Sequence, residues 1–268
     1  MRRGAFFTVA VAGAAVLLSG ASSGAAQTPP SPPQVGISGC TDDVPVRATR
    51  ELISFESRGR DIRAYLYTPR GEVNGAAIVL LHGGTGFEMN SILFDAHAIQ
   101  LASRGYLVML PAYFDAASPD QGRPTVTRRL WRQVALDAAA ALAAEPGVKP
   151  AEVALWGYSR GAFVAADAVT DPNSPIRSAV LAAGGGEVTE SVAGRDVSVL
   201  LLHAERDEAV PVRSTRRLAE TLREAGAAVD VQPLDFIGHQ YDLRTWCDVF
   251  ARTRTFLEGR AEADNGPA

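Results

Sequence analysis

A serine lies between two glycines in the stretch Gly157-Tyr158-Ser159-Arg160-Gly161, with a short apolar run before it and an alanine-rich apolar segment after it. Glycines two positions before and after the serine permit a tight strand-to-helix turn, because side chains there would collide where strand and helix approach. Such a turn holds the hydroxyl above a sheet, at the first turn of a helix whose amide groups favour negative charge. The pattern predicts Ser159 as a nucleophile. An ordinary serine in a glycine-rich turn is the alternative.

A serine nucleophile needs a base to take its proton, and the sequence holds four histidines. In the fold that uses this turn, an acidic residue and then the histidine follow the serine along the chain. His82 and His97 precede Ser159, and His203 ends an apolar run too early for an acid to come before it. His239 follows the last predicted strand in a glycine-containing loop. We therefore predict His239 as the base, with a surface or capping histidine as the alternative.

The acid that orients this histidine should follow the preceding strand, where three carboxylates occur in the segment 203–211. Asp207 lies in a short turn that ends at Val210-Pro211, and four residues separate it from the strand that we predict up to position 202. We predict Asp207 as the acid. Glu205 and Glu208 are the alternatives, as loop carboxylates that can exchange roles with it if the turn differs.

Acyl transfer also needs hydrogen-bond donors for a developing oxyanion, and His82-Gly83-Gly84-Thr85-Gly86 offers an unobstructed glycine turn after a strand. The backbone N–H groups of Gly84 and Arg160 are the predicted donors. A phosphate-binding turn is the weaker interpretation, because no Gly-Lys-Ser/Thr follows. The Arg160 side chain has two interpretations, pairing with a neighbouring acid or with a substrate carboxylate, and we favour the first because arginine is common on helices.

The surrounding pattern predicts a parallel sheet built from strand–helix–strand units. Two alternating segments, 48–56 and 62–68, read as an antiparallel hairpin at a sheet edge. Solid apolar runs then alternate with helix-length segments, which indicates strands buried on both faces. These runs are 76–81, 106–110, 153–156, 179–182, 197–202 and 228–231, and the predicted helices are 93–103, 128–144, 213–225 and 242–257.

Four motifs resemble, in order and spacing, those of the α/β-hydrolases of the dienelactone hydrolase-like group, and the likeness covers residues 62–257. They are the glycine turn at 82–84, the serine turn at 157–161, the acidic turn at 205–211 and the loop at 238–239. The resemblance implies a three-layer fold with a mostly parallel, eight-stranded sheet, and hydrolysis through an acyl-enzyme on Ser159. The dienelactone hydrolases proper carry cysteine at the matching position, so serine favours a plain carboxylic ester over a lactone. About a dozen residues lie before the strand at 197, where many relatives insert a cap. We therefore expect no large cap domain and an open cleft for a small or exposed ester, with Tyr113, Phe114 and Tyr158 as wall residues.

The chain divides into a secretory signal peptide at 1–26, a Pro-rich N-terminal arm at 27–45, a catalytic domain at 46–258 and a flexible tail at 259–268. Arg2 and Arg3, an apolar run at 5–18 and small residues up to Ala26 follow the order of an export signal. The run is shorter than the roughly 20 residues that cross a bilayer, which argues against the alternative of a membrane anchor. We predict a secreted or periplasmic protein.

Composition excludes several other classes. With 47% hydrophobic and 21% charged residues, the chain is neither disordered nor a multi-span membrane protein. The chain holds 26 Lys and Arg against 30 Asp and Glu, and the signal takes two of the arginines, so an acidic domain is expected, without a nucleic-acid partner. We predict no metal or cofactor, because Cys40 and Cys247 are badly spaced for zinc; they form either a disulfide or two unpaired thiols. A peptidase-like or lipid-ester hydrolase of the same fold and a non-catalytic binding protein are the rival functions.

Overall fold

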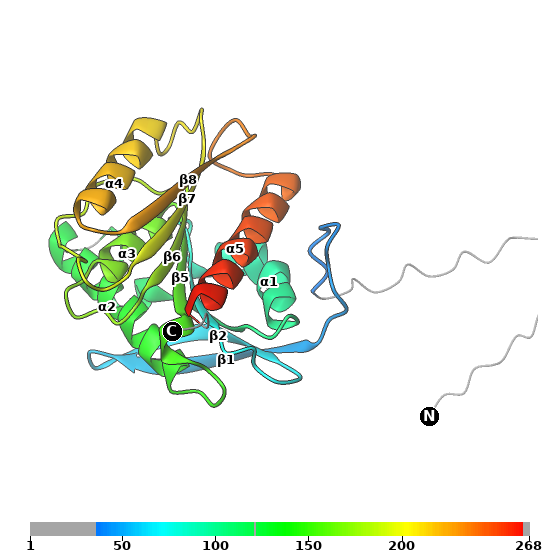
Figure 1. The fold of residues 1–268 in the computed structure, drawn as a ribbon. Coiled ribbons are helices and arrows are strands. Elements are labelled where there is room, and N and C mark those ends of the chain that lie inside the picture. Colours follow the sequence, from blue (N-terminus) through cyan, green and yellow to red (C-terminus); the bar gives the residue numbers. More distant parts are fainter. Residues whose placement is uncertain (1–35, 121, 265–268) are drawn as a thin grey trace, which may run out of the picture. The chain divides into compact units, whose positions relative to one another are not determined.

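An eight-stranded sheet between two layers of helices forms the core of the computed structural model, which describes residues 36–120 and 122–264 (Figure 1). The predicted signal segment lies outside the described residues. The strands are β1 (Ala48–Ser57), β2 (Arg60–Pro69), β3 (Ala77–Leu81), β4 (Leu107–Pro111), β5 (Val153–Tyr158), β6 (Ser178–Ala182), β7 (Ser198–Ala204) and β8 (Ala228–Leu234). The helices are α1 (Phe87–Ala102), α2 (Pro124–Ala143), α3 (Arg160–Val169), α4 (Val212–Glu224) and α5 (Leu243–Asp264), with 3-10 turns at Tyr113–Asp115 and Pro150–Glu152.

The sheet order is β1-β2-β4-β3-β5-β6-β7-β8. β1 and β2 form an antiparallel hairpin, β2 pairs antiparallel with β4, and every pairing from β4 to β8 is parallel. The predicted fold class is confirmed, including the hairpin at the edge. Residues 183–197, which join β6 to β7, contain no helix or strand, so no large cap stands at that position.

Both faces of the central sheet are buried, because helices cover each of them. α1 and α5 pack on one face and α2, α3 and α4 on the other (Figure 1). Side chains alternate between these layers along a strand, so Leu155 packs with the second group of helices and Trp156 with the first. All residues of β3 to β7 are buried, which explains the unbroken apolar runs of the sequence.

Two helices begin earlier than their apolar pattern predicts. α1 starts at Phe87 rather than position 93, because its first turn buries the polar side chain of Asn90 while Met89 and Ile92 are exposed. α2 starts at Pro124 rather than position 128, since proline is well suited to the first position of a helix.

The last helix ends later than predicted. α5 continues to Asp264, so its last six residues lie within the segment 259–268 that we predicted as a tail. Arg260 explains part of this extension, because its guanidinium donates to the Asp196 carboxylate at 2.9 Å and fixes the last turns to the domain. Across residues 36–120 and 122–264, none of the helices has both the length and the apolar character to cross a membrane.

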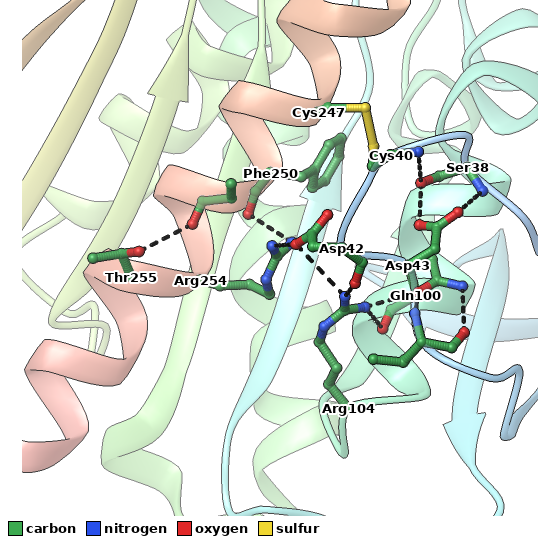
Figure 2. A network of polar contacts seen from close by, with 12 residues as sticks. Ser38, Cys40, Asp42, Asp43, Gln100, Arg104, Cys247, Phe250, Arg254 and Thr255 are labelled. Atoms are coloured by element: carbon green, nitrogen blue, oxygen red, sulfur yellow. Dashed lines mark hydrogen bonds and ion pairs between the residues drawn. A yellow bond between two sulfur atoms is a disulfide. The ribbon is translucent and has the colours of Figure 1, made fainter.

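The described part of the predicted arm lies against α1 and α5 (Figure 2). A disulfide joins Cys40 to Cys247 on α5, with a Cα–Cα distance of 5.4 Å. On α1, the Gln100 carboxamide accepts the Val44 N–H and donates to the Gly36 carbonyl, each at 2.8 Å. Further polar contacts join Asp42 to Arg104 and Arg254. Residues 36–45 of the predicted arm are therefore attached to α1 and α5 by a disulfide and by polar contacts.

Candidate active site

Ser159 lies at the turn between β5 and α3, at the carboxyl edge of the sheet. Its φ of 53° falls in the left-handed region, which costs energy for a residue with a side chain. The two flanking glycines make this turn feasible, because a β-carbon at Gly157 would lie 2.3 Å from the Gly161 carbonyl oxygen and one at Gly161 would lie 2.1 Å from that of Leu81. The turn is held by the Ser159 N–H, which donates to the Ala182 carbonyl at 2.9 Å.

The three side chains predicted to act together are in direct contact. His239 Nδ1 lies 2.7 Å from Asp207 Oδ2, and His239 Nε2 lies 2.8 Å from Ser159 Oγ. An ionised carboxylate only accepts hydrogen bonds, so Nδ1–H donates to Asp207 and Nε2 accepts the Ser159 hydroxyl proton. This arrangement can remove the serine proton while the carboxylate stabilises the imidazolium that forms.

The turn after β7 selects Asp207 among the three candidate acids. Its side chain is fully buried, and its second oxygen, Oδ1, accepts the N–H groups of Ala209 at 2.9 Å and Val210 at 2.7 Å. Glu205 and Glu208 are exposed at the surface of the same turn. Only Asp207 is both held by main-chain donors and in contact with the imidazole.

The predicted oxyanion donors belong to the loop after β3, which contains Gly84, and to the start of α3, which is Arg160. Arg160 is the first residue of α3, so its N–H has no helical partner one turn earlier. The Gly83 N–H donates to Asn90 Oδ1 at 3.1 Å, so it is already used within the domain. The next amide along this loop is the Gly84 N–H. Gly84 is exposed, and no hydrogen bond of its N–H occurs within the described ranges. Asn90 fixes this loop. It was not among the predicted site residues, because it lies before the segment 93–103 that we predicted as a helix.

The Arg160 side chain lies beside the same loop. Its Nε would be 3.4 Å from a β-carbon at Gly84, and its guanidinium carbon lies 5.7 Å from the centre of the Trp131 ring. In the part of the chain that the structure describes, Arg160 forms no ion pair with a carboxylate, so the favoured pairing with a neighbouring acid is not observed. Contact with an aromatic face takes its place.

A cleft of about 450 Å³ opens beside Ser159, between α2, α3 and the turn after Asp207. Apolar side chains from α2, α3 and the segments before α2 and after Asp207 form much of its lining, and the Arg128–Asp167 ion pair, with contacts of 2.6–3.0 Å, borders it. The principal apolar lining residues are Pro119, Trp131, Phe163, Val164 and Val210. This surface suits an apolar substituent of a substrate held at the serine.

The predicted wall residues do not line this cleft. Tyr113 is fully buried and Tyr158 is only 4% exposed, so the prediction that these two rings form the walls is wrong. The Tyr113 hydroxyl donates to the His82 carbonyl at 2.7 Å, and Phe114 packs its edge against the His82 ring. Through these contacts with His82, Tyr113 and Phe114 support the strand end beneath the glycine loop.

The other histidines occupy structural positions. Burial lowers the pKa of His82 and of His97 to about 4, so both rings are neutral at neutral pH. His203 contacts the Thr215 hydroxyl at 2.8 Å, and burial lowers its pKa as well. His239 is the histidine whose Nε2 contacts the Ser159 hydroxyl. Among residues 36–120 and 122–264, no group of three or more His, Cys, Asp or Glu side chains is placed to hold a metal ion.

Comparison with known proteins gives the family. The family model described as "Dienelactone hydrolase family" matches residues 62–242, which include Ser159, Asp207 and His239. The chain belongs to the dienelactone hydrolase family. It is a dienelactone hydrolase-like α/β hydrolase, as the resemblance of its motifs implied. No curated protein sequence matches this family member.

Solved structures share the fold of this family member. A proposed dienelactone hydrolase from Klebsiella pneumoniae aligns with a TM-score of 0.62 and 18% identity, over 79% of this chain and 98% of that one. Esterase 2 of Thermogutta terrifontis aligns with a TM-score of 0.57 and 19% identity, over 78% and 94%. Dipeptidyl peptidase 4 of Porphyromonas gingivalis aligns with a TM-score of 0.63 and 17% identity, over 80% of this chain but only 36% of the peptidase.

Proposed function

We propose that this protein is a serine hydrolase that cleaves small or exposed carboxylic esters through an acyl-enzyme on Ser159. The single observation that carries the proposal is the chain of contacts from Ser159 Oγ to His239 Nε2, at 2.8 Å, and from His239 Nδ1 to Asp207 Oδ2, at 2.7 Å. The apolar cleft beside the hydroxyl provides space for one part of the ester. An esterase and a peptidase both occur among the structures that share this fold, so esters and amides both belong in the test.

Each proton transfer in this reaction passes through His239. Nε2 takes the hydroxyl proton as Ser159 Oγ attacks the ester carbonyl, and the resulting imidazolium is stabilised by the Asp207 carboxylate. The N–H groups of Gly84 and Arg160 donate to the oxyanion of the tetrahedral intermediate. His239 then gives the proton to the leaving alcohol, which leaves the acyl group on Ser159. In the second half, His239 takes a proton from water as the water oxygen attacks the acyl carbonyl. It then gives that proton to Ser159 Oγ as the bond between Oγ and the acyl carbon breaks and the acid leaves.

Replacing the nucleophile tests the proposal directly. Ser159→Ala should abolish hydrolysis of p-nitrophenyl butyrate and labelling by a fluorophosphonate, while circular dichroism shows an intact fold. Ser54→Ala is the matched control, because this serine is exposed on β1 and away from the site. Labelling of the Ser159→Ala protein at another residue would refute the assignment. A parallel panel of aminoacyl amides, lactones and longer-chain esters identifies the class that is cleaved with the highest kcat/KM.

The choice of acid has its own test. Asp207→Asn keeps the shape of the side chain but presents the wrong partner to Nδ1–H, so kcat should fall by about 10³- to 10⁴-fold. Glu205→Gln and Glu208→Gln are matched controls on the same turn, and both should stay within about twofold of the unchanged protein because these side chains are exposed. A larger loss of kcat in Glu205→Gln or Glu208→Gln than in Asp207→Asn would assign the role of the acid to that glutamate instead.

We propose further that the protein acts after export, with residues 1–26 as the signal. The disulfide between Cys40 and Cys247 supports this, because such bonds persist mainly in oxidising compartments. Expression of the full chain with an export system, followed by N-terminal sequencing of the released protein, should give a chain that begins near Gln27. An uncleaved chain confined to the cytoplasm would contradict this proposal and leave the hydrolase proposal untouched.

A further inference from the structure

Tyr158 precedes the nucleophile and contacts the base through two different parts of its side chain. Its hydroxyl donates to the main-chain carbonyl of His239 at 2.5 Å. Its ring stacks against the imidazole, with the ring centres 5.3 Å apart and the planes 23° apart. One residue therefore touches both the backbone and the side chain of His239.

The loop that carries His239 is packed through the Tyr241 ring, but the backbone of His239 itself has few hydrogen bonds. Between β8 and α5, the main chain passes through Gly238, which adopts a φ of 114°, a conformation that side-chain-bearing residues rarely adopt. In the part of the chain that the structure describes, the hydrogen bond from Tyr158 is the one made by the His239 backbone. The polar contacts of the His239 side chain are with Asp207 and Ser159, which are themselves the proposed reacting partners.

Tyr158, in contrast, is rigidly held. It ends β5, pairs with Ala182 of β6, and is only 4% exposed. Its ring packs edge-on against Phe94 of α1 and Trp246 of α5, with the Trp246 ring centre at 4.9 Å. Burial raises the pKa of its hydroxyl above the ordinary value, so the group stays protonated and donates.

We infer that Tyr158 is a positioning residue for His239, an inference that rests on the proposed hydrolase function. The strand end that carries Ser159 thereby also holds the base, so both partners of the contact between Oγ and Nε2 are attached to the end of β5. Tyr158 does not line the cleft, so its contribution concerns turnover rather than binding.

Tyr158→Phe tests this because it removes the hydroxyl bond and keeps the ring. We expect kcat for p-nitrophenyl butyrate to fall about tenfold with KM within twofold, and the rate of fluorophosphonate labelling to fall in the same ratio. Tyr158→Leu removes both contacts and should lose about 100-fold. Tyr67→Phe is the matched control, because Tyr67 is fully buried and its hydroxyl bonds Asp95, 3.1 Å away, rather than the site. It should leave kcat within twofold.

A spectroscopic readout separates positioning from stability and from the proposed function. The Nδ1–H proton shared with Asp207 should give a far-downfield proton NMR signal, assigned by its loss in Asp207→Asn, that exchanges faster with water in Tyr158→Phe. Unchanged kcat and labelling, or a loss that only follows the unfolded fraction, would overturn the inference. If the unaltered protein hydrolyses no substrate and is not labelled by the fluorophosphonate, the proposed function fails. The NMR signal would still decide the positioning role in that case. An unchanged signal in Tyr158→Phe would refute it, and faster exchange would support it.

Discussion

Replacing both cysteines by alanine should weaken the folded state substantially, because the disulfide closes a loop with a sequence separation of 207 residues. In the chain-entropy description, closing a loop of this length removes about 18 cal/mol/K from the unfolded chain, which corresponds to about 5 kcal/mol at 25 °C. Measured losses for native disulfides reach about 2–5 kcal/mol. The folded arm keeps its contacts to Gln100 and Arg104, so we expect the free energy of unfolding to fall by about 2–5 kcal/mol.

Urea unfolding followed by tryptophan fluorescence measures this difference under non-reducing conditions. The Cys40→Ala/Cys247→Ala protein should unfold at lower urea with a larger m value, because its unfolded chain is less compact. Wild-type protein unfolded in the presence of reductant should coincide with the double variant, and each single variant should match it. A difference below about 1 kcal/mol, with no free thiol detected in the oxidised wild type, would refute the loop-entropy argument. Turnover should stay within twofold, since neither cysteine contacts the site.

Three further predictions concern the core around the site. A β-carbon at Gly161 would lie 2.1 Å from a main-chain oxygen, so Gly161→Ala should lower the free energy of unfolding by at least about 3 kcal/mol in thermal unfolding. Gly71→Ala is the control, with a loss of less than about 0.5 kcal/mol, because nothing lies within 4 Å of a β-carbon there. Equal losses would contradict the steric argument. Burial lowers the pKa of His97 from 6.5 to about 4, so the unfolded chain binds more protons and stability falls as the pH drops from about 6.5 to 4, by up to about 3 kcal/mol. His97→Phe should flatten that part of the curve in urea titrations at several pH values, and an unchanged slope would exclude this histidine as a cause. The Arg195 guanidinium donates to three main-chain carbonyls, one at the last residue of α3 and two beyond it, at 2.7–3.1 Å. Arg195→Met should therefore lower the free energy of unfolding by about 2 kcal/mol in calorimetry, and a neutral result would show that water replaces these bonds.

Local patterns were sufficient for the fold and for the nucleophile turn. Solid apolar runs mark strands that are buried on both faces. Glycine is required at positions 157 and 161 because α3 follows β5 so closely that a β-carbon at either position would collide with the main chain. Helix ends were predicted less well, because Pro124 and the buried Asn90 do not follow an apolar period.

The sequence by itself determined the candidate groups and their order along the chain: a serine at a strand end, an acid after a later strand and a histidine after the last one. The tertiary structure decided that Asp207, among the three candidate acids, is the one that is buried and contacts His239. It also decided that Cys40 bonds to Cys247 and that Tyr158 faces His239 rather than the cleft. The physical reason is that these choices depend on contacts between segments far apart in the chain. Such contacts are set by strand register, helix packing and side-chain direction, none of which a local pattern contains.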